Sequence, residues 1–385
     1  MFKAERFYHL DFLRGLAALL VLAGHLRAYT FKSFGELAHT DALTSAFYFI
    51  TGLGHQAVIL FFALSGFLVG GKAFEDIVSR RFLWSRYILR RLTRLWIVII
   101  PALLLTLMFD SLGSWLSHGN GYDGSYYGIY FQGPSTPQGV DDSLVSFLGN
   151  LAFLQTIYVP TFGSNGPMWS LANEFWYYIV FPLAAWAFLS RMSAVTRIGA
   201  LCGLMLAAAA LPLLLEGGAI WVAGAAACYC ARHPALSSFL HHTATRVVAI
   251  VVLFAALVLS KVPTANVGDL KLGFLVALVL PVLATLPSPG GVYRTAARAA
   301  SEISYTLYLT HFPLLTFIAM VTLAPTRFAP SAFSAGLYAC LIVVSIAWAA
   351  VIWWFFERNT DRVYSWIKRA WLTPTTLPAH AAPSR

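Results

Sequence analysis

The chain has 385 residues, of which 59% are hydrophobic and only 11% charged, and its mean hydropathy is +0.70. Soluble domains carry roughly 25% charged residues, so this composition excludes an ordinary soluble protein and predicts an all-α, polytopic membrane protein. The formal net charge of +10 does not indicate nucleic-acid binding, because the basic residues lie in short clusters between apolar runs, as cytoplasmic loops do.

Ten apolar stretches reach or approach the roughly 20 residues that a membrane-spanning helix needs. They lie near 9–29, 52–71, 92–109, 168–190, 197–215, 218–230, 246–260, 270–287, 302–323 and 332–356. Arg14 interrupts the first stretch and no clear cleavage site follows it, so we expect a retained span rather than a signal peptide. We expect one transmembrane domain over residues 1–370 and a disordered cytoplasmic tail at 371–385.

The basic residues predict the orientation of these spans. With both termini in the cytoplasm, only five Lys and Arg residues fall outside, namely Arg27, Lys32, Lys261, Lys271 and Arg327. A further apolar piece at 144–157 is too short to cross comfortably, and counting it as a crossing would invert every later loop. We therefore expect it to be re-entrant or to lie at the membrane interface.

The stretch "LDFLRGLAALLVLAGH" of the first span contains three ionisable residues. Arg14 and His25 are eleven residues apart, which is close to three helical turns, so both face the same way with roughly 16 Å of rise between them. Asp11 precedes Arg14 by three residues and is expected to pair with it. Ionisable groups inside a span usually face a cavity or each other, and histidine is the commonest general base near neutral pH.

Two motifs follow the first span. "HQAVILFFALSGFLVGG" contains Ser65 among small residues, which favour close helix packing or exposure of backbone to a ligand. "RRFLWSRYILRRLTRLW" includes Arg90, Arg91 and Arg94, which fit anchoring to anionic lipids or binding to a phosphorylated cytoplasmic ligand.

The outside loop from Asp110 to Asp142 contains no Lys or Arg but is rich in aromatic residues. Two interpretations stay open for them: stacking on sugar rings, or packing at the membrane interface, where tyrosine is common. These residues are Trp115, Tyr122, Tyr126, Tyr127 and Tyr130.

Later spans add further candidates. In "GPMWSLANEFWYYIVFP", Ser170 and Glu174 share one helical face, and Glu174 has no basic residue nearby in sequence. Its partner must come from another helix, and we expect it to meet and orient His25. "SEISYTLYLTHFPLL" contains His311, which fits either a packed side chain or a site residue. No metal site is expected: the four cysteines all lie in apolar segments.

Five of these segments, in this order, resemble the acyltransferase-3 family of bacterial integral membrane acyltransferases, over residues 8–356. The most specific are the Arg14 to His25 pair, the Ser-Gly-Phe-Leu signature at Ser65, and the Trp-Ser-Leu-x-x-Glu segment that begins at Trp169. The resemblance implies transfer of an acyl group, commonly acetyl, from cytoplasmic acyl-CoA to a hydroxyl of a carbohydrate-containing acceptor outside the bacterial inner membrane. It marks Arg14 and His25 as essential and includes Arg90, Arg91 and Arg94 in a basic motif.

The expected mechanism uses His25 as general base, with Glu174 beside it. Arg14 and the arginines at 90–94 would hold the phosphates of acyl-CoA, which is a substrate and not a resident cofactor. Direct transfer and an acyl-Ser65 or acyl-His25 intermediate both stay open, as does the oligomeric state. The alternative from another class is a transporter with Arg14, His25 and Glu174 in its substrate or proton pathway. The expected partners are acyl-CoA, a glycan or glycoside acceptor and membrane lipids.

Overall fold

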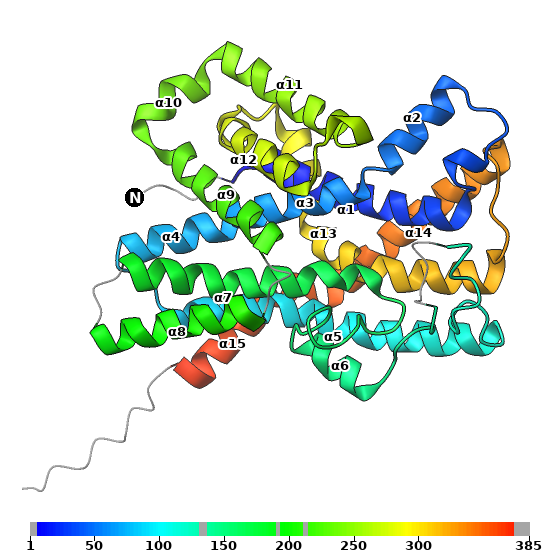
Figure 1. Ribbon diagram of the computed structural model, residues 1–385, viewed down its shortest axis with the longest axis horizontal. Coiled ribbons are helices and arrows are strands. Elements are labelled where there is room, and N and C mark those ends of the chain that lie inside the picture. Colours follow the sequence, from blue (N-terminus) through cyan, green and yellow to red (C-terminus); the bar gives the residue numbers. More distant parts are fainter. Residues whose placement is uncertain (1–5, 131–136, 190–192, 211–214, 373–385) are drawn as a thin grey trace, which may run out of the picture.

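The computed structural model describes residues 6–130, 137–189, 193–210 and 215–372. Over these residues the chain is a bundle of helices with two isolated β-bridges and no strand, which confirms the all-helical prediction (Figure 1). The helices are α1 (Tyr8–Thr30), α2 (Ala42–Thr51), α3 (Gly54–Ser65), η2 (Gly66–Gly70), α4 (Gly71–Val78), α5 (Trp84–Leu116), α6 (Leu144–Leu151), η3 (Gly166–Met168), α7 (Trp169–Leu189), α8 (Ala194–Ala210), α9 (Leu215–Arg232), α10 (Pro234–His241), α11 (Thr243–Leu259), α12 (Asp269–Thr285), α13 (Gly291–Ile318), η6 (Ala319–Leu323), α14 (Ala332–Phe355), η7 (Glu357–Asn359) and α15 (Thr360–Leu372), with short 3₁₀ turns at Phe34–Glu36 and Pro263–Ala265.

Five helical segments in the described part of the chain are long and apolar enough to cross a membrane. The pair α10 and α11, bent by 77°, makes a sixth if it counts as one span. The chain is therefore built as an integral membrane protein, while the count of ten spans and the cytoplasmic termini stay predictions. The five segments are Tyr8–Thr30, Ala42–Val78, Trp84–Leu116, Gly291–Leu323 and Ala332–Ala370.

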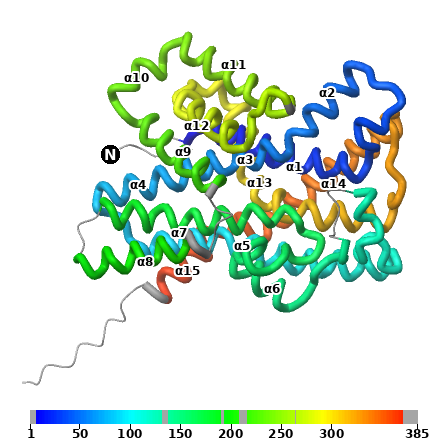
Figure 2. Tube along the Cα trace, in the orientation of Figure 1, coloured from blue at the N-terminus to red at the C-terminus, as the bar shows by residue number. Residues whose placement is uncertain are grey.

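The centre of the bundle is a parallel pair of helices, α1 and α13. Their contacts advance in the same order along both helices: Gly15 lies on Ala300, His25 meets His311, and Tyr29 Oη bonds Thr316 Oγ1 at 2.7 Å. A Cβ on Gly15 would lie 2.5 Å from Ala300 Cβ, so only glycine permits this close crossing. Helices α9–α12 cover one side of the pair and α5–α7 the other (Figure 2).

The first three long helical segments alternate in direction. The start of α3 lies near Gly24, whereas Phe67 in η2 packs on Phe7, so this segment runs antiparallel to α1. In contrast, α5 is parallel to α13, because its Leu95 contacts Tyr305 and its Phe109 contacts Phe317. This alternation is what successive membrane crossings require.

Glycines at the junction of α3 and α4 bring α9 into direct contact with it. A Cβ on Gly66 would lie 1.9 Å from the carbonyl oxygen of Trp221, and a Cβ on Gly224 would lie 2.1 Å from that of Ala63. The helix widens to a π-helix over Gly66–Gly70 just after Ser65. The small residues of this motif therefore serve helix packing, one of the two functions considered from sequence.

The segment that contains α6 enters and leaves the bundle at one end. The amide of Gly163 donates to the carbonyl of Asp141 at 2.7 Å, which joins the two ends of the excursion. At its far end, Leu151 O accepts from Trp96 Nε1 at 3.0 Å and Phe153 O accepts from Trp176 Nε1 at 3.0 Å. The two ends of this segment therefore lie together, while its re-entrant or interfacial position in the membrane stays a prediction.

Candidate functional site

His25 and His311 form a dyad where α1 meets α13. The distance from His25 Nδ1 to His311 Nε2 is 2.9 Å, and the two rings stack with an interplanar angle of 11°. Phe312 packs edge-on against His25 with ring centroids 4.8 Å apart. His311 is fully buried, whereas His25 is half-buried.

The hydrogen bonds assign the protons of this dyad in its neutral form. His311 Nδ1 lies 2.7 Å from the carbonyl oxygen of Leu307, which can only accept, so Nδ1 carries the proton and His311 Nε2 is an acceptor. His25 Nδ1 must then donate to it, which leaves the lone pair on His25 Nε2. This nitrogen has no hydrogen-bond partner among the described residues, so it can accept a proton.

A cavity of about 430 Å³ adjoins His25. Such a volume lies in the range of small-molecule sites. One wall is aromatic, with Trp169, Tyr308 and Phe312, and the cations Arg27 and Lys261 also line the space. The other lining residues are Val21, Gly24, Thr51, Gly52, Gly54, His55, Val58, Gly166 and Pro167.

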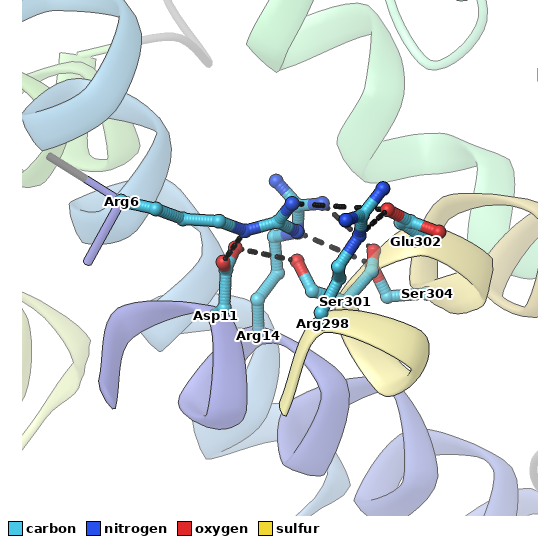
Figure 3. Close-up of polar contacts among 7 residues, drawn as sticks. All are labelled: Arg6, Asp11, Arg14, Arg298, Ser301, Glu302 and Ser304. Carbon is cyan, nitrogen blue, oxygen red and sulfur yellow. Dashed lines mark hydrogen bonds and ion pairs between the residues drawn. The ribbon is translucent and has the colours of Figure 1, made fainter. Parts of the chain in front are cut away.

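Arg14 lies near the other end of α1, where it also contacts α13. Its Nη2 donates to Ser301 O at 2.7 Å and its Nε to Ser304 Oγ at 3.2 Å, as Figure 3 shows. The expected ion pair with Asp11 is wrong. Asp11 accepts instead from Arg6 Nε at 2.5 Å and from Ser301 Oγ at 2.8 Å, because α13 brings hydroxyl and carbonyl groups between the two side chains.

The predicted basic motif divides between two surfaces. Arg91 and Arg94 are half-buried and turn inward; Arg91 lies over the rings of Tyr87 and Tyr178 with centroid distances of 5.8 Å. Arg94 lies within electrostatic range of Arg14. Arg90 is exposed and stacks on Tyr364 of α15 at 4.8 Å, one helical position away from the inward face.

A buried carboxylate accompanies Arg14 and Arg94, and the sequence analysis missed it. Glu357 is 9% exposed, lies in electrostatic range of both arginines, and accepts from Thr306 Oγ1 at 2.6 Å. The available signal was an acidic residue at the end of the last apolar run, followed at once by Arg358.

Glu174 does not contact His25, contrary to the expectation from sequence. Its Oε1 accepts from Ser65 Oγ at 2.6 Å and from the hydroxyl of Tyr178, and Trp221 Nε1 donates to Ser65 Oγ at 3.2 Å. The physical reason is position, since Glu174 points from α7 toward the start of the π-helix and not toward α1. The group that bonds the His25 ring is His311.

Trp169 lines the cavity from the start of α7, and the next residue, Ser170, contacts another lining residue, Tyr308. Ser170 Oγ and the hydroxyl of Tyr308 lie 2.7 Å apart, and that hydroxyl also lies 3.0 Å from Pro167 O. Ser170 thus fixes Tyr308, whose ring lies 6.3 Å from that of His311. The spacing of three residues between Tyr308 and His311 already placed both on one face of α13.

The aromatic loop is only partly available to a ligand. Tyr122 and Tyr130 are buried, at 4% and 2% exposure, whereas Trp115 is 73% exposed. A second cavity of about 420 Å³ is lined by Trp115, Tyr122 and the carboxylates of Asp110, Asp123 and Asp142. The described residues include no cluster of three or more metal-ligating side chains, and the expected tail at 371–385 lies mostly beyond them.

The fold and site define a helical integral membrane protein with a histidine dyad beside a cavity and a half-buried arginine, Arg14, about three helical turns away along α1. The model of the acyltransferase-3 family, described as an acyltransferase domain, matches residues 7–354. The chain belongs to this family, which confirms the resemblance seen in its motifs, and it is an acyltransferase. No curated protein and no solved structure matches the chain.

Proposed function

We propose that the protein transfers an acyl group, commonly acetyl, from cytoplasmic acyl-CoA to a hydroxyl of a carbohydrate-containing acceptor at the outer side of the bacterial cytoplasmic membrane. The observation that carries the proposal is the hydrogen-bonded dyad of His25 and His311 in the wall of the cavity. His311 fixes the tautomer in which His25 Nε2 is the base.

The proposed step needs a base and correct positioning. His25 Nε2 takes the proton of the acceptor hydroxyl while that oxygen attacks the thioester carbonyl carbon. The tetrahedral intermediate then expels the CoA thiolate, which takes the proton back from His25. A thioester is already reactive, so holding both substrates in line supplies much of the rate.

The donor's phosphates are assigned to the arginines. Arg14, Arg91 and Arg94 converge at the inner half of the bundle, and guanidinium groups suit bidentate phosphate binding. The exposed Arg90, which stacks on Tyr364, is assigned no contact with the phosphates. The rise from Arg14 to His25 is roughly 16 Å, comparable to an extended pantetheine arm.

Glu174 and Ser65 have a role in the proposal that differs from the expected contact of Glu174 with His25. Glu174 of α7 accepts hydrogen bonds from Ser65 of α3 and from Tyr178 of α7. Arg91 lies over the ring of the same Tyr178. We assign this network to positioning Arg91 for the donor. An acyl-Ser65 route is less well supported than direct transfer, because Ser65 does not line the cavity that contains His25.

The topology is proposed as ten crossings with both termini in the cytoplasm. The alternation of helix directions supports this, as does the position of the arginines of α5 at the end of the bundle that also holds Arg14. Because both ends of the α6 segment lie together, it adds no crossing, and the basic residues of the later loops then fall on the cytoplasmic side, as the positive-inside rule requires.

The decisive experiment uses purified protein in lipid nanodiscs, labelled acetyl-CoA and extracted bacterial surface glycans. We expect His25→Ala to abolish covalent label transfer and His39→Ala, at an exposed position, to leave it unchanged. Transfer at near wild-type rate by His25→Ala would refute the general base. In sealed vesicles, movement of label without covalent transfer would instead indicate the transporter alternative.

A further inference from the structure

The cavity beside His25 has an unusual charge for the outer half of a membrane protein. It contains the cations Arg27 and Lys261 and no carboxylate among its described lining residues. Asp269 lies outside this lining and contacts one of its members, His55, whose Nε2 is 2.8 Å from the carboxylate. The cavity is therefore electropositive next to the proposed base.

Neither cation is neutralised by a neighbouring acid. Arg27 lies over the ring of Tyr48 at 5.0 Å, forms no ion pair with a described carboxylate, and has a buried Nε without a hydrogen-bond partner. Lys261 donates to the carbonyl of Gly52 at the turn between α2 and α3. Burial, and then the nearby charge of Arg27, lower the pKa of the Lys261 ammonium, as expected for two like charges that share a space.

The other three outside cations, Lys32, Lys271 and Arg327, do not line the cavity. Arg327 pairs with Glu36 at 2.9 Å, and Lys271 donates to Asn266 O at 2.9 Å. Cations are disfavoured on the outer side by the positive-inside rule, and an ionisable group in a span normally faces a partner or a ligand. Arg27 and Lys261 face the same cavity as the base and have no such acidic partner.

We propose that this site takes an anionic acceptor, whose carboxylate or phosphate is bound by Arg27 and Lys261 while its hydroxyl faces His25. The inference rests on the proposed function and specifies its acceptor class. The aromatic wall, with Trp169, supplies a stacking face for a sugar ring on the same ligand. Uronic acids and sugar phosphates share the required chemistry, and they differ in the anion that they present.

The first experiment measures binding without chemistry. Methyl β-D-glucuronide, glucose 1-phosphate and neutral methyl β-D-glucoside are titrated into the nanodisc protein by calorimetry. We expect one or both anions to bind at least about tenfold more tightly than the neutral glycoside, with the preference falling as salt rises. The stronger of the two anions identifies carboxylate or phosphate as the natural group.

Variants then assign the preference to residues. Arg27→Gln and Lys261→Gln should each weaken anion binding about tenfold and leave neutral glycoside binding unchanged. Lys271→Gln is the matched control, because it removes an outside cation that does not line the cavity. Equal affinity for charged and neutral glycosides, or equal loss with Lys271→Gln, would overturn the proposal.

A transfer assay separates this inference from the proposed function. Labelled acetyl-CoA is supplied with an acidic glycan and with the same glycan after its carboxylates are reduced to alcohols, or after phosphatase treatment. Higher transfer to the charged form supports the inference, and equal transfer to both forms overturns it while the acyltransferase function stands. If anions bind in a way that depends on Arg27 but no acyl group is transferred to any acceptor, the proposed acyl transfer is refuted and the anion-binding site still stands.

Discussion

Replacing His311 with phenylalanine would remove the acceptor that fixes the His25 ring. The distance from His25 Nδ1 to His311 Nε2 is 2.9 Å, and His311 is 0% exposed, so water cannot replace the lost partner without entering the packed interface. Leaving a buried donor unpaired costs about 1–3 kcal/mol. Phenylalanine keeps the ring volume beside Phe312, so most of this cost falls on the orientation and tautomer of His25.

The expected consequence is a loss of catalytic rate with little change in donor binding. A change of about 1–3 kcal/mol corresponds to a fall in kcat of about fivefold to 160-fold at 25 °C. The KM for acyl-CoA should stay the same, because the arginines lie about three turns from the dyad along α1. His311→Gln retains an amide oxygen that can accept from His25 Nδ1, so its activity should lie between that of the wild type and that of His311→Phe.

The assay is steady-state transfer of labelled acetyl in nanodiscs, with thermal unfolding as a check on folding. A double-mutant cycle with His25→Ala makes the test specific, because adding His311→Phe to an already inactive variant should give no further loss. Wild-type kcat in a folded His311→Phe protein would refute the positioning of His25 by His311. A rise in KM for acyl-CoA at constant kcat would refute it equally.

Three further predictions follow from other parts of the structure. Arg14→Gln should raise the KM for acyl-CoA at least about tenfold, measured by donor titration, and an unchanged KM would remove Arg14 from the phosphate site. Gly66→Ala should lower thermal stability by about 1–3 kcal/mol, because its Cβ would meet the carbonyl of Trp221 at 1.9 Å; a stability equal to the wild type would contradict the tight packing. The pKa of Glu36 is held below its usual value by the backbone amide of Ser33, opposed by desolvation, and then by Arg327. The contacts of Glu36 with Ser33 and Arg327 should therefore be complete at pH values above the ordinary glutamate pKa and should be lost as pH falls through the lowered pKa. Increased protease cleavage near Glu36 at acidic pH would show this loss. Glu36→Gln should make the cleavage independent of pH.

The sequence was most informative where chemistry and spacing within one helix coincide. The eleven residues from Arg14 to His25 already implied two functional ends on one face of α1, and both contact α13 in the structure. The apolar length of the spans and the distribution of basic residues likewise predicted the helical bundle and the excursion at 144–157. These features depend on local periodicity, which a single sequence contains.

Pairings between distant helices could not be predicted in the same way. Glu174 and His25 were both polar groups without a local partner, so joining them was reasonable, but α7 carries Glu174 to Ser65 and α13 brings His311 to His25. Glu357 escaped notice because its contacts with Thr306 and the arginines depend on where the last long helix ends. Helix positions and rotations are set by tertiary packing, which composition does not specify.

The dyad on α1 and α13 can form only late in the synthesis of the chain. His25 and His311 are 286 residues apart in the chain, so α1 enters the membrane long before its partner exists. At about 5–20 residues per second, synthesis of that interval takes roughly 15–60 s. Throughout this time Arg14 and His25 lack their final neighbours, and a chain cut short before α13 has no dyad. The dyad therefore forms only when nearly the whole chain has been made.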